Sequence, residues 1–279
     1  MERAPDGARQ CGIDHRSHGD SAEGVDGEAA LTPLVGVLVG GAGVVAGGVN
    51  AIAGGGSLLT FPVLLAAGLS PVTANVTNTV GVVPGTVGGS FGYRRELVGQ
   101  GRRILTLGVP ATIGAILGGV ILLTAPAGVF KAVVPVLIAG ACVLLLLQPR
   151  LARSLEGHRS EHGSRAARVG IFFVGMYGGY FGAAIGVMLL GLLGLLVNDS
   201  LQRLNALKNV MAGMVNGIAA VLFAFAAHVD WIAALALAVG TVVGGRIGAH
   251  LARRIPDRPL RLGIAFIGLV VAGILAVTS

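Results

Sequence analysis

The chain is poor in charged, aromatic and sulfur-containing residues. Charged residues make up 12% and aromatic residues 5% of its 279 positions, and there are two cysteines. Cys11 lies in a polar stretch and Cys142 in an apolar run, so they provide neither a disulfide framework nor the ligand spacing of a metal site. A Walker A lysine is also missing, which excludes ATP-driven pumping by this chain alone. We expect no cofactor and no bound metal.

Acid–base chemistry inside an apolar protein needs titratable groups at depth, and this sequence has few. Glu96, Asp230, His228 and His250 fall in loops or near the ends of apolar segments. Without a central acid–base pair or metal cluster, the sequence argues against an intramembrane enzyme. It also gives no support for proton coupling through a buried carboxylate.

Apolar residues and glycine are what the chain has in abundance. Hydrophobic residues account for 54% of the sequence, and 47 residues are glycine. This balance lies outside that of soluble domains, and glycine is common where membrane helices pack closely or break. We therefore predict an all-α, polytopic transmembrane protein that is not an enzyme.

A helix that crosses the hydrocarbon layer needs about 20 apolar residues. This length predicts eight to ten membrane segments, drawn from residues 31–50, 56–69, 72–93, 104–124, 128–148, 168–186, 187–198, 204–228, 231–251 and 260–278. The first two segments, and likewise 168–186 with 187–198, each include a short piece and a glycine-rich break. These two pairs are predicted to be thin hairpins or re-entrant half-helices.

The two halves of the sequence resemble each other. A gapless shift of 131 residues places Gly55 on Gly186 and Asn78 on Asn209, together with several other glycines and leucines. We therefore predict an internal duplication. The expected domains are a disordered polar tail at 1–30, a first transmembrane repeat at 31–148, a cytoplasmic arginine-rich linker at 149–167 and a second repeat at 168–279.

Loop charge indicates how the repeats are oriented. Seven of the 13 acidic residues precede residue 29, whereas arginines cluster at 94–103, 150–168 and 253–261. These loops are expected to be cytoplasmic, while the loop 228–230, which corresponds to 94–103, has no Lys or Arg. Equivalent loops thus face opposite sides, as in inverted repeats, with both termini outside. We read the high basicity as a topology signal of a multi-pass inner (plasma) membrane protein and expect no nucleic-acid partner.

The most informative stretch for function is the glycine run at 54–56. Three consecutive glycines disfavour helix, and a break at membrane depth is tolerated only where it is buried or lines a polar cavity. Ser57 would then be the N-cap of the following half-helix, whose N–H groups and positive dipole end suit an anion. Alternatively, the glycines only permit close helix crossing.

Polar residues in the following helices extend this candidate site. Amides and hydroxyls can donate to an anion and release it, although interhelical hydrogen bonding is the simpler interpretation for any single asparagine. Lys208 lies about a turn inside its segment, where it is either functional or reaches the interface beside Arg203. The predicted substrate-binding residues are Asn50, Gly54, Gly55, Gly56, Ser57, Thr77, Asn78, Tyr180, Lys208, Asn209 and Asn216.

The same stretches resemble the sulfite exporter TauE/SafE family of membrane permeases. The resemblance covers about residues 31–278 and is carried by residues 50–62, 74–80, 84–85, 89–97, 178–183 and 205–209. It implies a plasma-membrane carrier for sulfite, sulfonates or other small sulfur-containing or organic anions. The family's usual span count is below ten, which favours half-helices at the glycine breaks.

The sequence therefore predicts a permease that moves a small anion by alternating access without ATP hydrolysis. The alternatives are a passive anion channel and a membrane anchor or receptor subunit that transports nothing. Besides the anion, the expected partner is the lipid bilayer, and self-association into a homo-oligomer stays open.

Overall fold

A computed structural model describes residues 33–154, 165–251 and 257–278, all of whose regular elements are helices. These helices are α1 (Pro33–Ile52), α2 (Ser57–Ala66), α3 (Pro71–Gly92), α4 (Gly101–Thr124), α5 (Ala127–Ser154), α6 (Arg165–Tyr180), α7 (Ile185–Leu196), α8 (Leu201–Ala226), α9 (Trp231–Leu251) and α10 (Asp257–Thr278). The all-α prediction is confirmed, and each of the predicted apolar segments contains one of these helices. The predicted tail at 1–30 lies outside the described residues.

The helices around the central linker and the position of the second break differ from the predicted segments. α5 continues to Ser154 and α6 begins at Arg165, so both helices extend into the stretch predicted as a linker. The second break in the apolar sequence lies at 181–184 rather than at 186–187. Gly182 has φ +72° and Ala184 has φ +60°, and two left-handed residues this close together cannot continue a right-handed helix.

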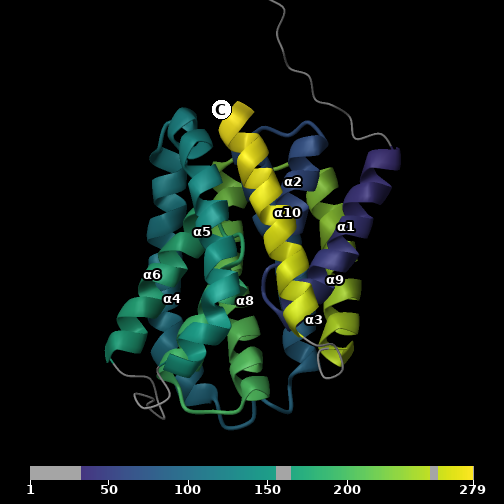
Figure 1. Ribbon diagram of the computed structural model, residues 1–279. Helices are drawn as coiled ribbons and strands as arrows, with labels where there is room; N and C mark the ends of the chain where they lie inside the picture. The colour runs from purple at the N-terminus through teal and green to yellow at the C-terminus, as the bar shows by residue number, and fades with distance from the viewer. Residues whose placement is uncertain (1–32, 155–164, 252–256, 279) are drawn as a thin grey trace, which may run out of the picture. The chain divides into compact units, whose positions relative to one another are not determined.

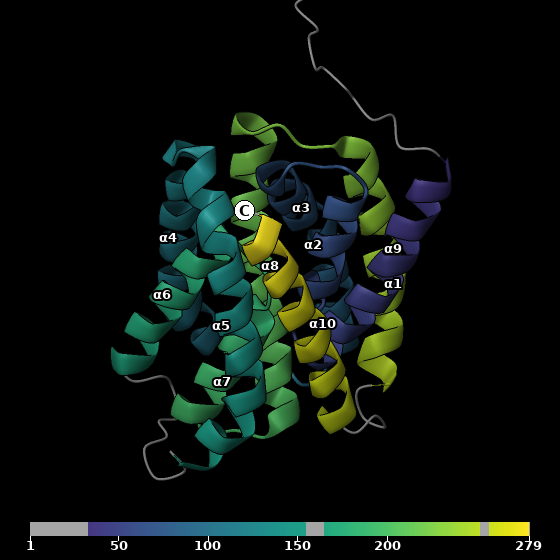
Figure 2. The same ribbon diagram turned by 45° about the horizontal axis from the view of Figure 1, so that its top comes forward.

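The described helices together form one helical unit with two ends. The short helices α2 and α7 lie towards opposite ends of this unit (Figures 1 and 2). α1 begins at the end where α10 finishes, whereas α6 begins at the opposite end (Figure 1). α2 then runs back towards the end where α1 started, and α7 runs back towards the start of α6. Each of these helix pairs therefore enters and leaves on the same side.

Small residues allow the helices to pack at backbone distance. α1 lies along α9, where a Cβ on Gly244 would be 1.8 Å from the Val44 carbonyl oxygen. α6 lies along α4 in the same way, and a Cβ on Gly118 would be 1.9 Å from the Met176 carbonyl oxygen. α3 also packs on α9 as α8 packs on α4. The two halves of the chain thus use the same packing scheme.

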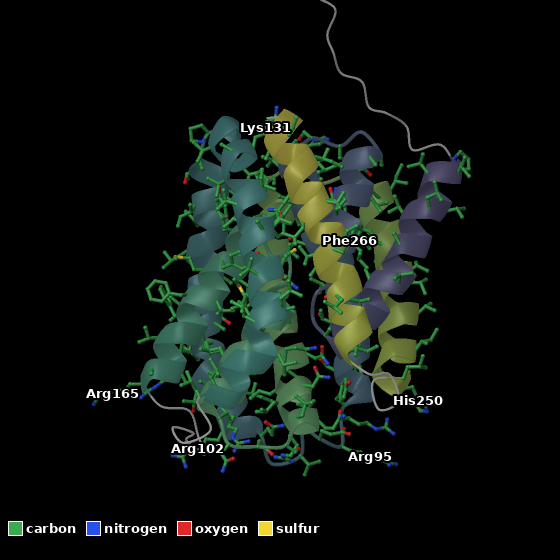
Figure 3. The ribbon with its side chains drawn as sticks, in the orientation of Figure 1. Arg95, Arg102, Lys131, Arg165, His250 and Phe266 are labelled. Atoms are coloured by element: carbon green, nitrogen blue, oxygen red, sulfur yellow. The ribbon has the colours of Figure 1, made fainter. Side chains whose placement is uncertain are left out.

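The surface suits a lipid environment between two polar ends. α1, α4, α8 and α9 are long and apolar enough to cross a membrane, and large side chains such as Phe225 and Phe266 are exposed on helix faces. Figure 3 shows Arg95, Arg102 and Arg165 at one end of the helices, which we call the arginine end. α1 starts and α10 finishes at the other end.

Candidate functional site

The two helix breaks meet at Gly54 and Gly186. Gly54 has φ +83°, and a Cβ added to it would lie 2.4 Å from the carbonyl carbon of Gly186. A Cβ on Gly186 would in turn lie 2.5 Å from the Cα of Gly54. Backbones in such contact leave no room for a side chain on either residue. This contact joins the two halves of the chain through residues that are more than a hundred positions apart in the sequence.

The first break spans residues 53–56 and is organised by the side chain of Asn50. Its Oδ1 accepts a hydrogen bond of 2.8 Å from the amide of Gly56. Gly56, not Ser57, is the N-cap of α2, so the predicted N-cap is wrong. A Cβ on Gly56 would be 2.0 Å from the carbonyl oxygen of Ala46, so this N-cap position has room only for glycine. Ser57 is buried as the first helical residue.

The second break spans residues 181–184 and is held by Tyr177. The amides of Phe181 and Gly182 both donate to the Tyr177 carbonyl oxygen, at 2.8 and 3.3 Å. The Tyr177 hydroxyl donates to the carbonyl oxygen of Ala183 at 2.8 Å. Ala184, in the left-handed region, is the N-cap of α7. The ring of Phe181 packs edge-on against Phe61 of α2, with centroids 5.3 Å apart, which further joins the two breaks.

α2 and α7 both begin next to the Gly54–Gly186 contact and run from it to opposite ends of the unit (Figure 2). A helix N-terminus has amides without intrahelical partners and the positive end of the helix dipole. Two such ends directed at one point favour negative charge there.

Lys208 of α8 lies at the end of α1 rather than at the surface. Its side chain is 0% exposed, and its ammonium donates to the carbonyl oxygens of Asn50 and Ala51 at 2.9 and 3.4 Å. The interpretation that Lys208 reaches the interface beside Arg203 is therefore wrong. The carbonyls at the C-terminus of α1 attract the ammonium because they form the negative end of that helix.

Two residues next to Lys208 contact the same helix end. The amide of Asn205 donates to the Ala51 carbonyl oxygen at 3.2 Å and to the Tyr93 hydroxyl at 2.9 Å. The Tyr93 hydroxyl lies 3.4 Å from that carbonyl as well. Neither was among the predicted binding residues, although a Tyr directly after one apolar helix and an Asn within another could have indicated this role.

α3 makes the corresponding contact with α6. The amide nitrogen of Asn75 donates to the carbonyl oxygen of Tyr180, the last residue of α6, at 3.0 Å. Asn78 accepts a hydrogen bond of 2.5 Å from the Thr60 hydroxyl of α2. Thr77 lies nearer the end of the unit, where its hydroxyl accepts from the Asp230 amide at 3.0 Å. The polar residues of α3 thus face three different neighbours.

Asn209 has a buried amide nitrogen without a hydrogen-bond partner. The residue is 3% exposed, and its Nδ2 is the only donor among the unpartnered buried side-chain atoms found in the described residues. Its amide carbon would be 4.0 Å from a Cβ on Gly89 of α3. A buried donor of this kind calls for an acceptor such as water or a ligand.

Asn216 lies two turns further along α8 and belongs to different surroundings. Its Oδ1 would be 3.6 Å from a Cβ on Gly182 in the second break. The predicted residues therefore fall into groups rather than one pocket. Asn50, Lys208 and Asn209 lie towards the end of α1, Gly54 at the crossing, and Tyr180 with Asn216 at the end of α6.

The arginine end has an ion cluster between the two halves of the chain. Asp199, in the α7–α8 connection, accepts from Arg103 of α4 and, at 3.0 Å, from Arg203 of α8. Partial burial raises the pKa of Asp199, but the hydrogen bonds from Arg203 and Arg103 outweigh it and hold the pKa below its ordinary value. Arg203 also donates to the Val98 carbonyl oxygen at 3.1 Å.

No group of three or more His, Cys, Asp or Glu side chains in the described ranges is arranged to hold a metal ion. The site consists instead of amides, hydroxyls, backbone ends and one ammonium, which suit reversible binding of an anion better than bond-making chemistry.

A family model for the sulfite exporter TauE/SafE matches residues 38–275. A probable membrane transporter protein YfcA of Escherichia coli strain K12 is 28% identical over 218 residues, which cover 78% of this chain and 80% of the relative. A probable membrane transporter protein of Haemophilus influenzae is 27% identical over 196 residues, covering 70% and 76% of the two chains. No solved structure gives a significant match.

Proposed function

Because the chain belongs to the sulfite exporter TauE/SafE family and is a membrane transporter, we propose that it carries a small anion across the bilayer by alternating access. The anion class that we propose is sulfite, a sulfonate or a related small sulfur-containing or organic anion. ATP hydrolysis has no part in this cycle.

The meeting of two helix N-termini at the Gly54–Gly186 contact is the observation that carries this proposal. Each N-terminus is equivalent to roughly half an elementary positive charge. Inside the bilayer that partial charge is screened far less than in water, so it acts strongly on an anion. Since these partial charges belong to the backbone, they hold the anion without the tight ion pair that would slow its release.

Two residues of α8 complete the proposed anion site. Lys208 brings the one fully charged group among the buried side chains of the described residues. Asn209 brings a buried amide donor that has no protein acceptor. Lys208 and Asn209 are consecutive residues of α8, which packs beside the first break. Gly54, Gly55, Gly56 and Ser57 form the backbone side of this site, with Asn50 and Asn78 supporting it through the hydrogen bonds described above.

Thr77, Tyr180 and Asn216 do not enter the proposed anion site. The Thr77 hydroxyl accepts from Asp230 near the end of the unit. Tyr180 and Asn216 present a carbonyl and an amide oxygen near the second break. Oxygen acceptors repel an anion rather than bind it.

Alternating access is supported by the shared packing scheme of the two halves and by the opposite starting ends of α1 and α6 (Figure 1). We propose that the halves are inverted repeats in a multi-pass inner-membrane protein, with the arginine end in the cytoplasm. Rocking one repeat against the other would expose the proposed anion site at the Gly54–Gly186 contact to each side of the membrane in turn. A passive anion channel on the same scaffold is the alternative function.

Counterflow in proteoliposomes tests the function. Proteoliposomes that contain the purified chain would be loaded with an unlabelled anion. The same anion in labelled form (sulfite, thiosulfate, sulfoacetate or a carboxylate) would then be added outside. A carrier gives transient accumulation above equilibrium for its substrate, because exchange couples the two fluxes. A channel gives no overshoot and instead shows single-channel conductance. Absence of flux for every anion in a folded preparation would refute both.

Orientation is tested separately with single cysteines in the loops 94–103 and 228–230, in a chain whose Cys11 and Cys142 are replaced. An impermeant thiol reagent added to intact cells should label only the second loop. Labelling of both loops from one side would exclude inversion.

A further inference from the structure

The C-terminal ends of α1 and α6 are corresponding parts of the two halves, but their electrostatic surroundings differ. At the end of α1, the Lys208 ammonium binds the carbonyl oxygens of Asn50 and Ala51. At the end of α6, the Tyr180 carbonyl oxygen accepts from the neutral amide of Asn75. Among the buried side chains of the described residues, Lys208 is the only charged one. The negative end of α6 is therefore not matched by a buried cationic side chain.

Oxygen atoms from three helices gather at this end of α6, around Gly182. A Cβ on Gly182 would lie 3.1 Å from the Gly178 carbonyl oxygen, 3.5 Å from Thr79 Oγ1 and 3.6 Å from Asn216 Oδ1. Because Gly182 has no side chain, no Cβ stands between these three oxygens. We call these three oxygens the Gly182 oxygen cluster.

The Gly178 carbonyl oxygen lacks the partner that a continuing helix would give it. The amide of Gly182, four residues on, donates to Tyr177 instead, at 3.3 Å. Nearby, Asn75 is 1% exposed and its Oδ1 is a buried acceptor without a hydrogen-bond partner. Its Nδ2 binds Tyr180, so this residue belongs to the same helix end. Buried acceptors without donors are costly unless a ligand satisfies them.

We propose that the Gly182 oxygen cluster binds a monovalent cation, Na⁺ being the fitting probe, which takes the part at the end of α6 that the Lys208 ammonium takes at the end of α1. All ligands are neutral oxygens, which suit a hard cation of single charge rather than a transition metal. Backbone carbonyls at the end of an interrupted membrane helix are a recurring way to hold a coupling ion in transporters.

The position also gives a route to coupling. Gly182 and the N-terminus of α7 belong to one short break, so a cation at Gly182 lies close to the proposed anion site. A cation and an anion bound together attract each other, which lowers the cost of removing both from water. This coupling rests on the proposed function, whereas cation binding itself does not.

Equilibrium binding of ²²Na⁺ to the purified full chain in detergent, without any transported anion, tests the site. We expect saturable binding that unlabelled Na⁺ displaces and choline does not. Thr79→Val together with Asn216→Leu should weaken it by about tenfold or more, since two of the three oxygens are lost. Thr79→Val alone is isosteric and should weaken it by a smaller factor.

Thr86→Val is the matched control. The Thr86 hydroxyl, like that of Thr79, donates to a backbone carbonyl of α3, but Thr86 lies two turns further along the helix and is not part of the Gly182 oxygen cluster. This variant should bind ²²Na⁺ as the unaltered chain does. The inference is overturned if the folded, unaltered chain shows no saturable binding. It is equally overturned if Thr79→Val binds like the unaltered chain, or if Thr86→Val loses as much as Thr79→Val.

Counterflow of the anion separates this inference from the proposed function. Equal counterflow in Na⁺ and in choline, with no ²²Na⁺ binding, would remove the cation site and leave the anion carrier in place. Saturable ²²Na⁺ binding with no counterflow of any anion would do the reverse.

Discussion

The ammonium of Lys208 lies 2.9 Å from the carbonyl oxygen of Asn50, so a side chain of the second half neutralises the end of the first helix. Asn50 uses its other oxygen, Oδ1, to accept from the amide of Gly56, which begins the next helix. The shape of the first break therefore depends on a residue more than 150 positions away. A charge that orders the break also lies beside the place where we propose that the anion binds.

Lys208→Met should retain the volume of the side chain and lose its charge. We expect anion counterflow to fall by at least about tenfold, and the free energy of unfolding to drop by about 1–3 kcal/mol because two carbonyls lose a buried donor. Counterflow and thermal unfolding in detergent measure the two effects. Lys208→Arg keeps the charge and should recover part of the flux. Full transport by Lys208→Met would remove the ammonium from the mechanism.

Asn209→Leu should abolish anion uptake with little loss of stability. The Nδ2 atom of Asn209 has no protein partner, so its removal breaks no hydrogen bond from that atom within the protein. We expect counterflow to fall to the level of empty liposomes while the melting temperature stays within a few degrees. Asn78→Leu is the informative comparison, because it removes the acceptor of the Thr60 hydroxyl and should cost both uptake and stability. Normal flux in Asn209→Leu contradicts the proposed site.

Gly54→Ala should prevent the two breaks from meeting. The new Cβ would lie 2.4 Å from the Gly186 backbone, and φ +83° is strained for alanine. We expect loss of monodisperse protein in size-exclusion chromatography and loss of transport. Gly36→Ala in α1 is the control, since nothing lies within 4 Å of its added Cβ. Normal elution of Gly54→Ala would show that the contact is not needed.

Acidification should weaken the ion cluster at Asp199. Its folded-state pKa lies below the ordinary Asp value of 3.8, so the cluster adds stability above that pH. This contribution is lost as the pH falls from about 3.8 through the lower folded pKa. Asp199→Asn should lower the melting temperature at pH 7, and the difference in melting temperature between this variant and the unaltered chain should shrink as the pH falls below about 3.8. The same difference at pH 7 and below about pH 3.8 would show that the ionised carboxylate contributes nothing.

Composition and periodicity were enough to predict the fold class and the first helix break without knowledge of the tertiary structure. An excess of apolar residues over charged ones can be buried only in lipid or in other helices, so the all-α membrane architecture followed from it. The glycine run at 54–56 indicated the first helix break, because consecutive glycines stabilise helix poorly. The family resemblance rested on the same stretches and is confirmed.

The particular partners of the polar residues were decided by the tertiary structure alone. Asn75, Asn78 and Asn205 look alike in the sequence, yet they bind Tyr180, Thr60 and Ala51 respectively. Helical spacing tells which residues share a face, but not which helix that face meets. From its spacing in the sequence, Lys208 could reach the interface or point inward. Folding brings the C-terminus of α1 beside it, and the ammonium is buried because it donates to the carbonyl oxygens there. Long-range contact between helix ends, which local propensity does not encode, therefore separates the residues that stabilise the breaks from those left able to bind an ion.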